Sequence, residues 1–265
     1  MMMEHLLIIS DLDDTLLNQK GEMAEDDSRR LNELLDVKNV YFSIATARDV
    51  EDFKKSHLNL KMNIPIILCN GRLIYDSVRK KVVHCFYLEQ VLEEAVIQKL
   101  TGLDVVVNGV GVKENQIIRE IIDPHFLKEK NRIHGCMIDI STLVRVDKVD
   151  MICQKLKKDF NQELTSRVYD NPYQPEYKII DIQPQRFNKG LALEYLKEII
   201  PFPCRTISFG NGVDDIPMFI HSDSSVAVGD CPKEVLKAAD KSIVYKKGSV
   251  IDEMARYIRT FQQEA

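Results

Sequence analysis

Residues 5–17 read HLLIISDLDDTLL, an apolar run that passes directly into a cluster of carboxylates. Four large aliphatic residues in succession are typical of a strand that is buried on both faces. In an open parallel sheet, ligands bind at the carboxyl ends of such strands, and Asp11, Asp13 and Asp14 follow this one at once. Clustered carboxylates repel one another unless a proton or a cation such as Mg²⁺ offsets their charge. The stretch indicates a cation site with a carboxylate nucleophile; the alternative is an acidic turn that only caps a helix.

Short apolar runs alternate with helical patterns on either side of the middle of the chain. This alternation indicates parallel βαβ units, so we expect an α/β fold with a doubly wound parallel, Rossmann-like sheet. Further strands are expected at 40–44, 64–68, 205–209, 225–228 and 243–245, and helices at 27–37, 49–58, 188–200, 214–221, 233–239 and 250–261.

The middle of the chain has a different pattern, which mixes helices with strands and includes an expected helix over 116–128. It indicates a separate α+β module inserted into the sheet domain. We therefore expect a core of residues 1–82 and 185–265, interrupted by an inserted domain of residues 83–184.

Composition restricts the partners and the compartment. The 265 residues carry a formal net charge of −5, which argues against nucleic-acid binding. No apolar stretch approaches the roughly 20 residues of a membrane span, and the N-terminus lacks the pattern of a signal peptide. The six cysteines are scattered without a C-x-x-C pair, as expected for reduced thiols. We expect a cytoplasmic protein, monomeric or homodimeric, with neither a nucleic-acid nor a membrane partner.

Three further segments carry polar groups at predicted strand ends or helix starts. Thr46 closes a strand in Ala45-Thr46-Ala47-Arg48, where a hydroxyl followed by a backbone N–H suits phosphate binding. Lys189 opens a helix, which the helix dipole disfavours unless an anion lies beside it. The stretch 209–215, FGNGVDD, is a glycine-rich acidic turn suited to holding a metal.

These four segments, in this order, resemble the motifs of the haloacid dehalogenase superfamily of phosphotransferases. The resemblance implies that Asp11 is the nucleophile, that Asp13 is the general acid and base, and that Lys189 offsets the developing charge. It also implies a Mg²⁺ cofactor. The implied or suggested metal ligands are Asp11, Asp13, Asn211 and Asp215, and the substrate-binding residues are Leu12, Thr46, Ala47, Arg48, Asn70, Gly71 and Asp214.

Several of these assignments have a second explanation. Arg48 either binds the substrate phosphate or forms a salt bridge at the rim. Asn70 and Gly71 either line the site or form an ordinary hairpin turn.

The spacing of the motifs leaves room for a large insertion only between Thr46 and Lys189. This position makes the chain similar to the Cof-type subfamily with a type IIB cap, which includes sucrose-phosphate and mannosyl-3-phosphoglycerate phosphatases. The resemblance implies that residues 83–184 form a cap domain that sets substrate specificity. The implied activity is Mg²⁺-dependent hydrolysis of small phosphomonoesters, sugar phosphates or related metabolites, through an aspartyl phosphate.

The sequence departs from the family pattern at two places. Ala47 replaces the usual glycine of T-G-R, which leaves a backbone contact intact. The metal turn reads Gly-Asn-Gly-Val-Asp-Asp over 210–215 instead of the usual G-D-G-x-N-D, so Asn211 and Asp214 are exchanged. The alternatives are therefore a phosphomutase of the same superfamily, a catalytically weakened phosphometabolite sensor, or a protein-interaction module that uses the cap surface.

Overall fold

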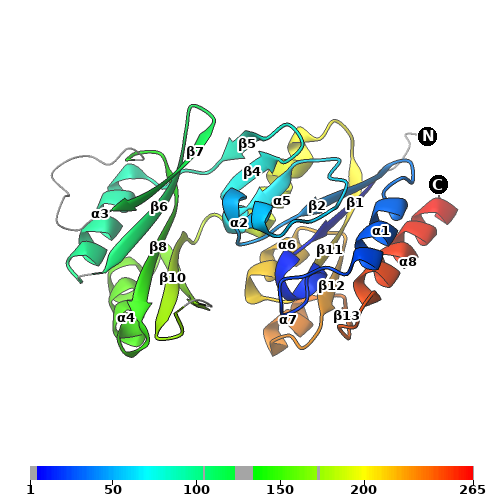
Figure 1. The fold of residues 1–265 in the computed structure, drawn as a ribbon. Coiled ribbons are helices and arrows are strands. Elements are labelled where there is room, and N and C mark those ends of the chain that lie inside the picture. The colour runs from blue at the N-terminus through cyan, green and yellow to red at the C-terminus, as the bar shows by residue number, and fades with distance from the viewer. Residues whose placement is uncertain (1–4, 104, 123–133, 172–173, 265) are drawn as a thin grey trace. The chain divides into compact units, whose positions relative to one another are not determined.

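The computed structural model describes residues 5–103, 105–122, 134–171 and 174–264 (Figure 1). The chain divides into two compact units, of which each is described by itself. The core unit consists of Met1–His84 and Asn188–Ala265, and the inserted unit of Cys85–Phe187.

The core unit is built on a parallel sheet with the strand order β13-β12-β11-β1-β2. Its strands are β1 (His5–Ser10), β2 (Val40–Ile44), β11 (Cys204–Gly210), β12 (Ser224–Val228) and β13 (Lys241–Ile243). A single parallel bridge between Ala45 and Ile67 joins β3 (Ile66–Leu68) beside β2. The doubly wound parallel sheet expected from the sequence is confirmed.

The four middle residues of the central strand β1 are all large and apolar. It pairs with β11 on one side and with β2 on the other, and Leu6, Leu7, Ile8 and Ile9 are all completely buried. Both faces of the strand are covered at these four positions, which accounts for their apolar side chains. The three strands β1, β2 and β11 run in one direction, and their carboxyl ends therefore lie at the same edge of the sheet.

Helices connect and cover these strands. Figure 1 shows α1 (Glu25–Leu34) and α8 (Ser249–Glu264) side by side, and an ion pair between Arg30 and Asp252 joins them. Helix α5 (Lys189–Ile199) packs against α6 (Ile216–Ile220). The remaining core helices are α2 (Val50–Lys55) and α7 (Lys233–Ala238). Strands β4 (Leu73–Asp76) and β5 (Lys81–Cys85) form a three-stranded sheet with β3, in the order β3-β4-β5.

The described residues of the inserted unit form an antiparallel sheet with two α-helices. The strand order is β7-β6-β8-β10-β9, and apolar residues of the sheet and both helices form one buried cluster. The elements are α3 (Gln90–Thr101), β6 (Val106–Lys113), β7 (Gln116–Ile122), β8 (Met137–Arg145), α4 (Val149–Phe160), β9 (Leu164–Asp170) and β10 (Tyr177–Pro184).

The helix expected over 116–128 is wrong for its first seven residues, which form β7; the last part, 123–128, lies outside the described residues. The isoleucines of Gln116–Ile122 fit a helical spacing, but they are β-branched and suit a strand. The preceding Glu114 and Asn115 have φ values of 51° and 61°, which fold β6 and β7 into a tight hairpin. The tight turn at Glu114 and Asn115, and not the helical spacing of the isoleucines, therefore determines that this segment is a strand.

No helix in the described parts of the chain has the length and apolar character that a membrane span requires.

Candidate active site

A buried lysine lies among three carboxylates at the edge of the core sheet. Lys189 Nζ is 2.6 Å from Asp11 Oδ1 and 2.6 Å from Asp215 Oδ1. The same Nζ is 3.1 Å from Asp214 Oδ2. Lys189 is only 1 % exposed and Asp11 6 %, so these charges interact with little screening by water. The structure therefore brings together residues from the ends of β1 and β11 and from the start of α5.

The burial of these groups shapes their protonation. Burial raises the pKa of Asp11 to about 8; Lys189 acts in the opposite direction, and the neighbouring Asp215 and Asp214 reinforce the rise. Burial also raises the pKa of Asp215. For Lys189, burial alone would lower the pKa, but attraction by the three carboxylates raises it well above the ordinary value. Lys189 is therefore a permanent cation that offsets negative charge at this point.

The turn after β11 holds Asp215 in place. Asp215 Oδ2 accepts hydrogen bonds from the backbone N–H groups of Asn211 and Gly212, both at 2.9 Å. Because Oδ1 binds Lys189, both oxygens of this carboxylate already have protein partners. Asp215 thus links the turn after β11 to Lys189. Its role as a metal ligand stays a prediction.

Gly210 has no side chain, and the Asp215 carboxylate occupies the space that a side chain there would fill. A Cβ at Gly210 would lie 2.5 Å from Asp215 Cγ, which is shorter than any real contact of this kind. We expect Gly210→Ala to displace the Asp215 carboxylate, to loosen Lys189, and to reduce catalytic turnover at least about 10-fold, as a misplaced site residue does. Steady-state kinetics would check this. Gly102→Ala is a suitable control, because a Cβ at Gly102 has 3.5 Å of space and full activity is expected.

The segment after β2 adopts a compact loop. Thr46 is buried, and its Oγ1 accepts a hydrogen bond of 3.2 Å from the backbone N–H of Arg48. Ala47 between them is exposed. Leu12 is completely buried in the turn after β1.

Arg48 forms the salt bridge that was one of its two expected roles, and its partner is Asp13. The guanidinium binds both carboxylate oxygens, with Nε 2.9 Å from Oδ2 and Nη2 2.6 Å from Oδ1. The Asp13 side chain is 47 % exposed, in contrast to buried Asp11. A bidentate pair of this kind fixes the orientation of the Asp13 side chain.

Gly71 lies where the backbone conformation and a close neighbouring chain segment both require a glycine. Its φ is +100°, and a Cβ there would lie 2.2 Å from the Asn188 carbonyl oxygen. Asn188 in turn caps α5 by accepting a hydrogen bond from the Leu191 N–H. The close approach at Gly71 therefore positions the start of the helix that carries Lys189, and it is a structural requirement independent of any ligand.

The sequence analysis did not single out Thr15. Its Oγ1 donates to Asp11 Oδ2 over 3.3 Å, four residues along the chain. The sequence feature that could have predicted this contact is the hydroxyl four residues after Asp11 in Asp-Leu-Asp-Asp-Thr, because a turn there brings residue 15 back toward residue 11.

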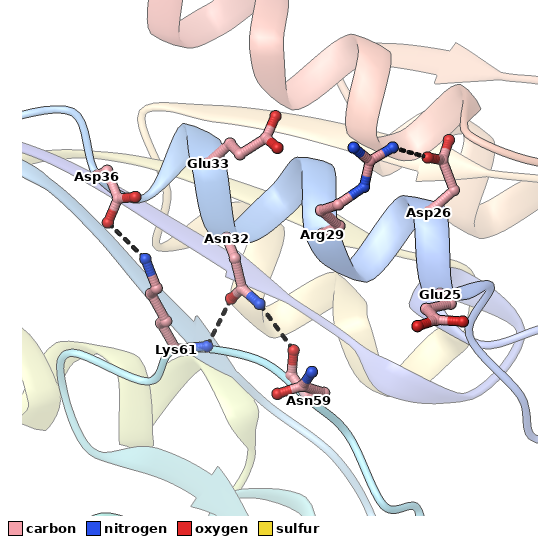
Figure 2. Close-up of a pocket in the computed structure, with 8 residues that line it drawn as sticks. All are labelled: Glu25, Asp26, Arg29, Asn32, Glu33, Asp36, Asn59 and Lys61. Atoms are coloured by element: carbon pink, nitrogen blue, oxygen red, sulfur yellow. Dashed lines mark hydrogen bonds and ion pairs between the residues drawn. The ribbon is translucent and has the colours of Figure 1, made fainter.

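A hollow elsewhere in the core unit has a different character (Figure 2). It lies along α1, and its charged groups are largely engaged with one another, as in the ion pair of Lys61 with Asp36 at 2.7 Å. Asn32 bonds to the backbone of Asn59 and Lys61. None of the residues of the carboxylate–lysine site lines this hollow.

The fold and the site together define an α/β enzyme with a buried aspartate and lysine at the ligand-binding edge of a parallel sheet. The model of the haloacid dehalogenase-like hydrolase family matches residues 8–253, so the chain belongs to this family. The resemblance stated from the sequence is confirmed.

Three known proteins illustrate the relationship. The 5-amino-6-(5-phospho-D-ribitylamino)uracil phosphatase of Bacillus subtilis is 25 % identical over 239 residues, 88 % of each chain. The crystal structure of TM0651 from Thermotoga maritima has a TM-score of 0.71 at 19 % identity, covering 96 % of this chain and 97 % of its own. The HAD subclass IIB sugar phosphatase BT4131 has a TM-score of 0.64 at 16 % identity, covering 97 % and 99 %. The family and the named relative support a phosphatase activity.

Proposed function

We propose that the protein is a Mg²⁺-dependent phosphatase that hydrolyses small phosphomonoesters through an aspartyl-phosphate intermediate on Asp11. The observation that carries this proposal is the 2.6 Å contact between Lys189 Nζ and the buried Asp11 carboxylate. A cation in that position offsets the charge of a nucleophilic carboxylate and of a phosphoryl group that approaches it.

The reaction follows two steps on this chain's residues. An Asp11 oxygen attacks phosphorus and forms an O–P bond, while the ester O–P bond breaks and the leaving oxygen takes a proton from Asp13. Water then attacks the aspartyl phosphate, its proton passes to Asp13, and inorganic phosphate leaves with the Asp11 carboxylate restored. Because Arg48 binds both carboxyl oxygens of Asp13, this pair must loosen before Asp13 reaches the leaving oxygen.

The donor set near Asp11 fits the cation that the family uses. Mg²⁺ commonly binds one or two carboxylates, with water and phosphate oxygens completing its shell. Asp11 Oδ2, whose hydrogen bond from Thr15 is long, the Asp13 backbone carbonyl and the Asn211 amide oxygen would supply this set. Among the residues that the structure describes, no three His, Cys, Asp or Glu side chains form a group that could hold a metal ion by themselves. When bound, Mg²⁺ would offset charge on the phosphoryl group.

The exchange of Asn211 and Asp214 leads to a prediction about metal affinity. A neutral amide attracts a divalent cation less than a carboxylate does, so Asn211→Asp is expected to lower the Mg²⁺ concentration for half-maximal activity by roughly 10-fold. Activity measured against Mg²⁺ concentration would check this, with Asn161→Asp, on the inserted unit, as the matched control. An unchanged Mg²⁺ requirement would remove Asn211 from the ligand set.

The substrate class is proposed from the relatives. One is named for a ribityl phosphate and another as a sugar phosphatase, and both names describe polyhydroxylated phosphate esters. We therefore propose sugar phosphates or related metabolites as substrates, with the inserted unit as the cap that selects among them.

The sensor alternative depends on Asp214, which would repel phosphate if its charge were free. The 3.1 Å contact of Asp214 with Lys189 offsets that charge and so favours catalysis. A phosphomutase would differ by its need for a bisphosphate activator.

The test is phosphate release from an aryl phosphate and a panel of sugar phosphates, with Mg²⁺ and after its removal by a chelator. We expect turnover that depends on Mg²⁺ and needs no bisphosphate. A folded protein without turnover across the panel would contradict the proposal and favour a sensor.

A further inference from the structure

Asn70 carries a buried side chain that the reaction described above does not use. The residue is 2 % exposed, and it lies in the turn Cys69–Gly71 that follows β3. Neither Nδ2 nor Oδ1 of its amide has a hydrogen-bond partner. Its φ is +52°, and that of Cys69 is +51°, so two successive residues take the left-handed conformation to form this turn.

A buried amide without partners is costly. Each such group loses its hydration on burial, and no hydrogen bond within the protein replaces it. Folded proteins pair nearly all of their buried polar atoms, and an exception calls for a ligand, water or ion. The position therefore suits a residue that finds its partners when a ligand binds.

The neighbours of Asn70 indicate which ligand this is. Its backbone N–H donates to the Thr46 carbonyl over 2.9 Å, and the Cys69 N–H donates to the Arg48 carbonyl over 2.9 Å. On the other side, Gly71 lies directly against the Asn188 carbonyl and near the Lys189 nitrogen. Asn70 is thus tied between the Thr46 loop and the start of α5.

We propose that Asn70 binds the phosphoryl group, with its amide Nδ2 donating to a phosphoryl oxygen between Thr46 and Lys189. This proposal rests on the proposed phosphatase function. A phosphoryl group supplies acceptor oxygens for Nδ2, and in its monoprotonated form it also supplies the donor that Oδ1 lacks. The amide adds a hydrogen bond without adding charge, beside a site whose cation is already Lys189. Asn70 is then a substrate-binding residue.

Two variants test the proposal with inorganic phosphate as the probe. Asn70→Gly removes the amide and keeps a residue that tolerates a positive φ. Asn70→Asp keeps the shape, removes the donor and adds a negative charge. By calorimetry in the presence of Mg²⁺, we expect phosphate affinity to fall about 10- to 100-fold in Asn70→Gly, as for a lost hydrogen bond to a charged group. Asn70→Asp should lose more, because it also repels the anion.

Asn39 provides the matched control. It is also left-handed, with a φ of +64°, but it precedes β2 at the opposite edge of the sheet. Asn39→Gly and Asn39→Asp should bind phosphate like the wild type. The Asn70 side chain makes no hydrogen bond within the protein, so its removal breaks none. The melting temperature of Asn70→Gly should therefore be no lower than that of Asn39→Gly.

Equal phosphate affinity in the wild type and both Asn70 variants would overturn the inference and assign the amide to an internal water. A melting temperature of Asn70→Gly well below that of Asn39→Gly, with phosphate affinity retained, would overturn it in favour of a structural role. In either case, turnover by the wild type leaves the phosphatase proposal standing. If the wild type neither releases phosphate from any ester nor binds it, both proposals fail.

Discussion

Asp11→Asn should abolish phosphate release, with a loss of about 10³-fold or more in turnover, as for removal of a nucleophile. The amide keeps the shape of the side chain but cannot form the acyl phosphate. Lys189 retains its contacts with Asp215 and Asp214, so the variant should still fold. Phosphate release with saturating Mg²⁺ measures the effect, and circular dichroism verifies the fold.

Asp36→Asn is the control for this change. Asp36 pairs with Lys61 on the surface, in the hollow of Figure 2, and both side chains are more than half exposed. Such a pair contributes about 0–1 kcal/mol, so the control should keep full activity. If Asp11→Asn retained a tenth or more of wild-type turnover, Asp11 would not be the nucleophile.

Lys189→Met should impair both activity and stability. Methionine has a similar length but no charge, so Asp11, Asp214 and Asp215 lose their shared buried cation. Breaking a buried ion pair on one side typically costs about 3–5 kcal/mol, because the remaining charge is uncompensated. We expect a clearly lower free energy of unfolding in urea and a loss of at least about 10²-fold in turnover.

Lys197→Met is the matched control on the same helix. Lys197 pairs with Glu194 at 2.7 Å, and both side chains are partly exposed. A surface pair of this kind contributes little, so its removal should change stability by less than about 1 kcal/mol. Equal stability of the two variants would show that the Lys189 cluster is not a shared ion-pair network.

Much of the site was predictable because it follows strand ends. Asp11 and Asp215 come after β1 and β11, which are neighbours in the sheet, and Lys189 opens a helix where a cation needs an anion nearby. The contacts of these residues were less predictable. The sequence placed Asp215 in the acidic turn after β11, but it did not predict that the N–H groups of Asn211 and Gly212 bind one of its oxygens and Lys189 the other.

The sequence by itself determined the buried central strand, the alternation that produces the parallel sheet, and the identity of the charged groups at its edge. These are local patterns of burial and turn chemistry that residue order expresses directly. Only the tertiary structure decided that Arg48 binds Asp13, that Gly71 meets Asn188, and that the Asn70 amide is buried without a partner. The first two join segments that are distant in the chain, and the third follows from the loss of water around a buried turn. Local propensity determines none of these contacts.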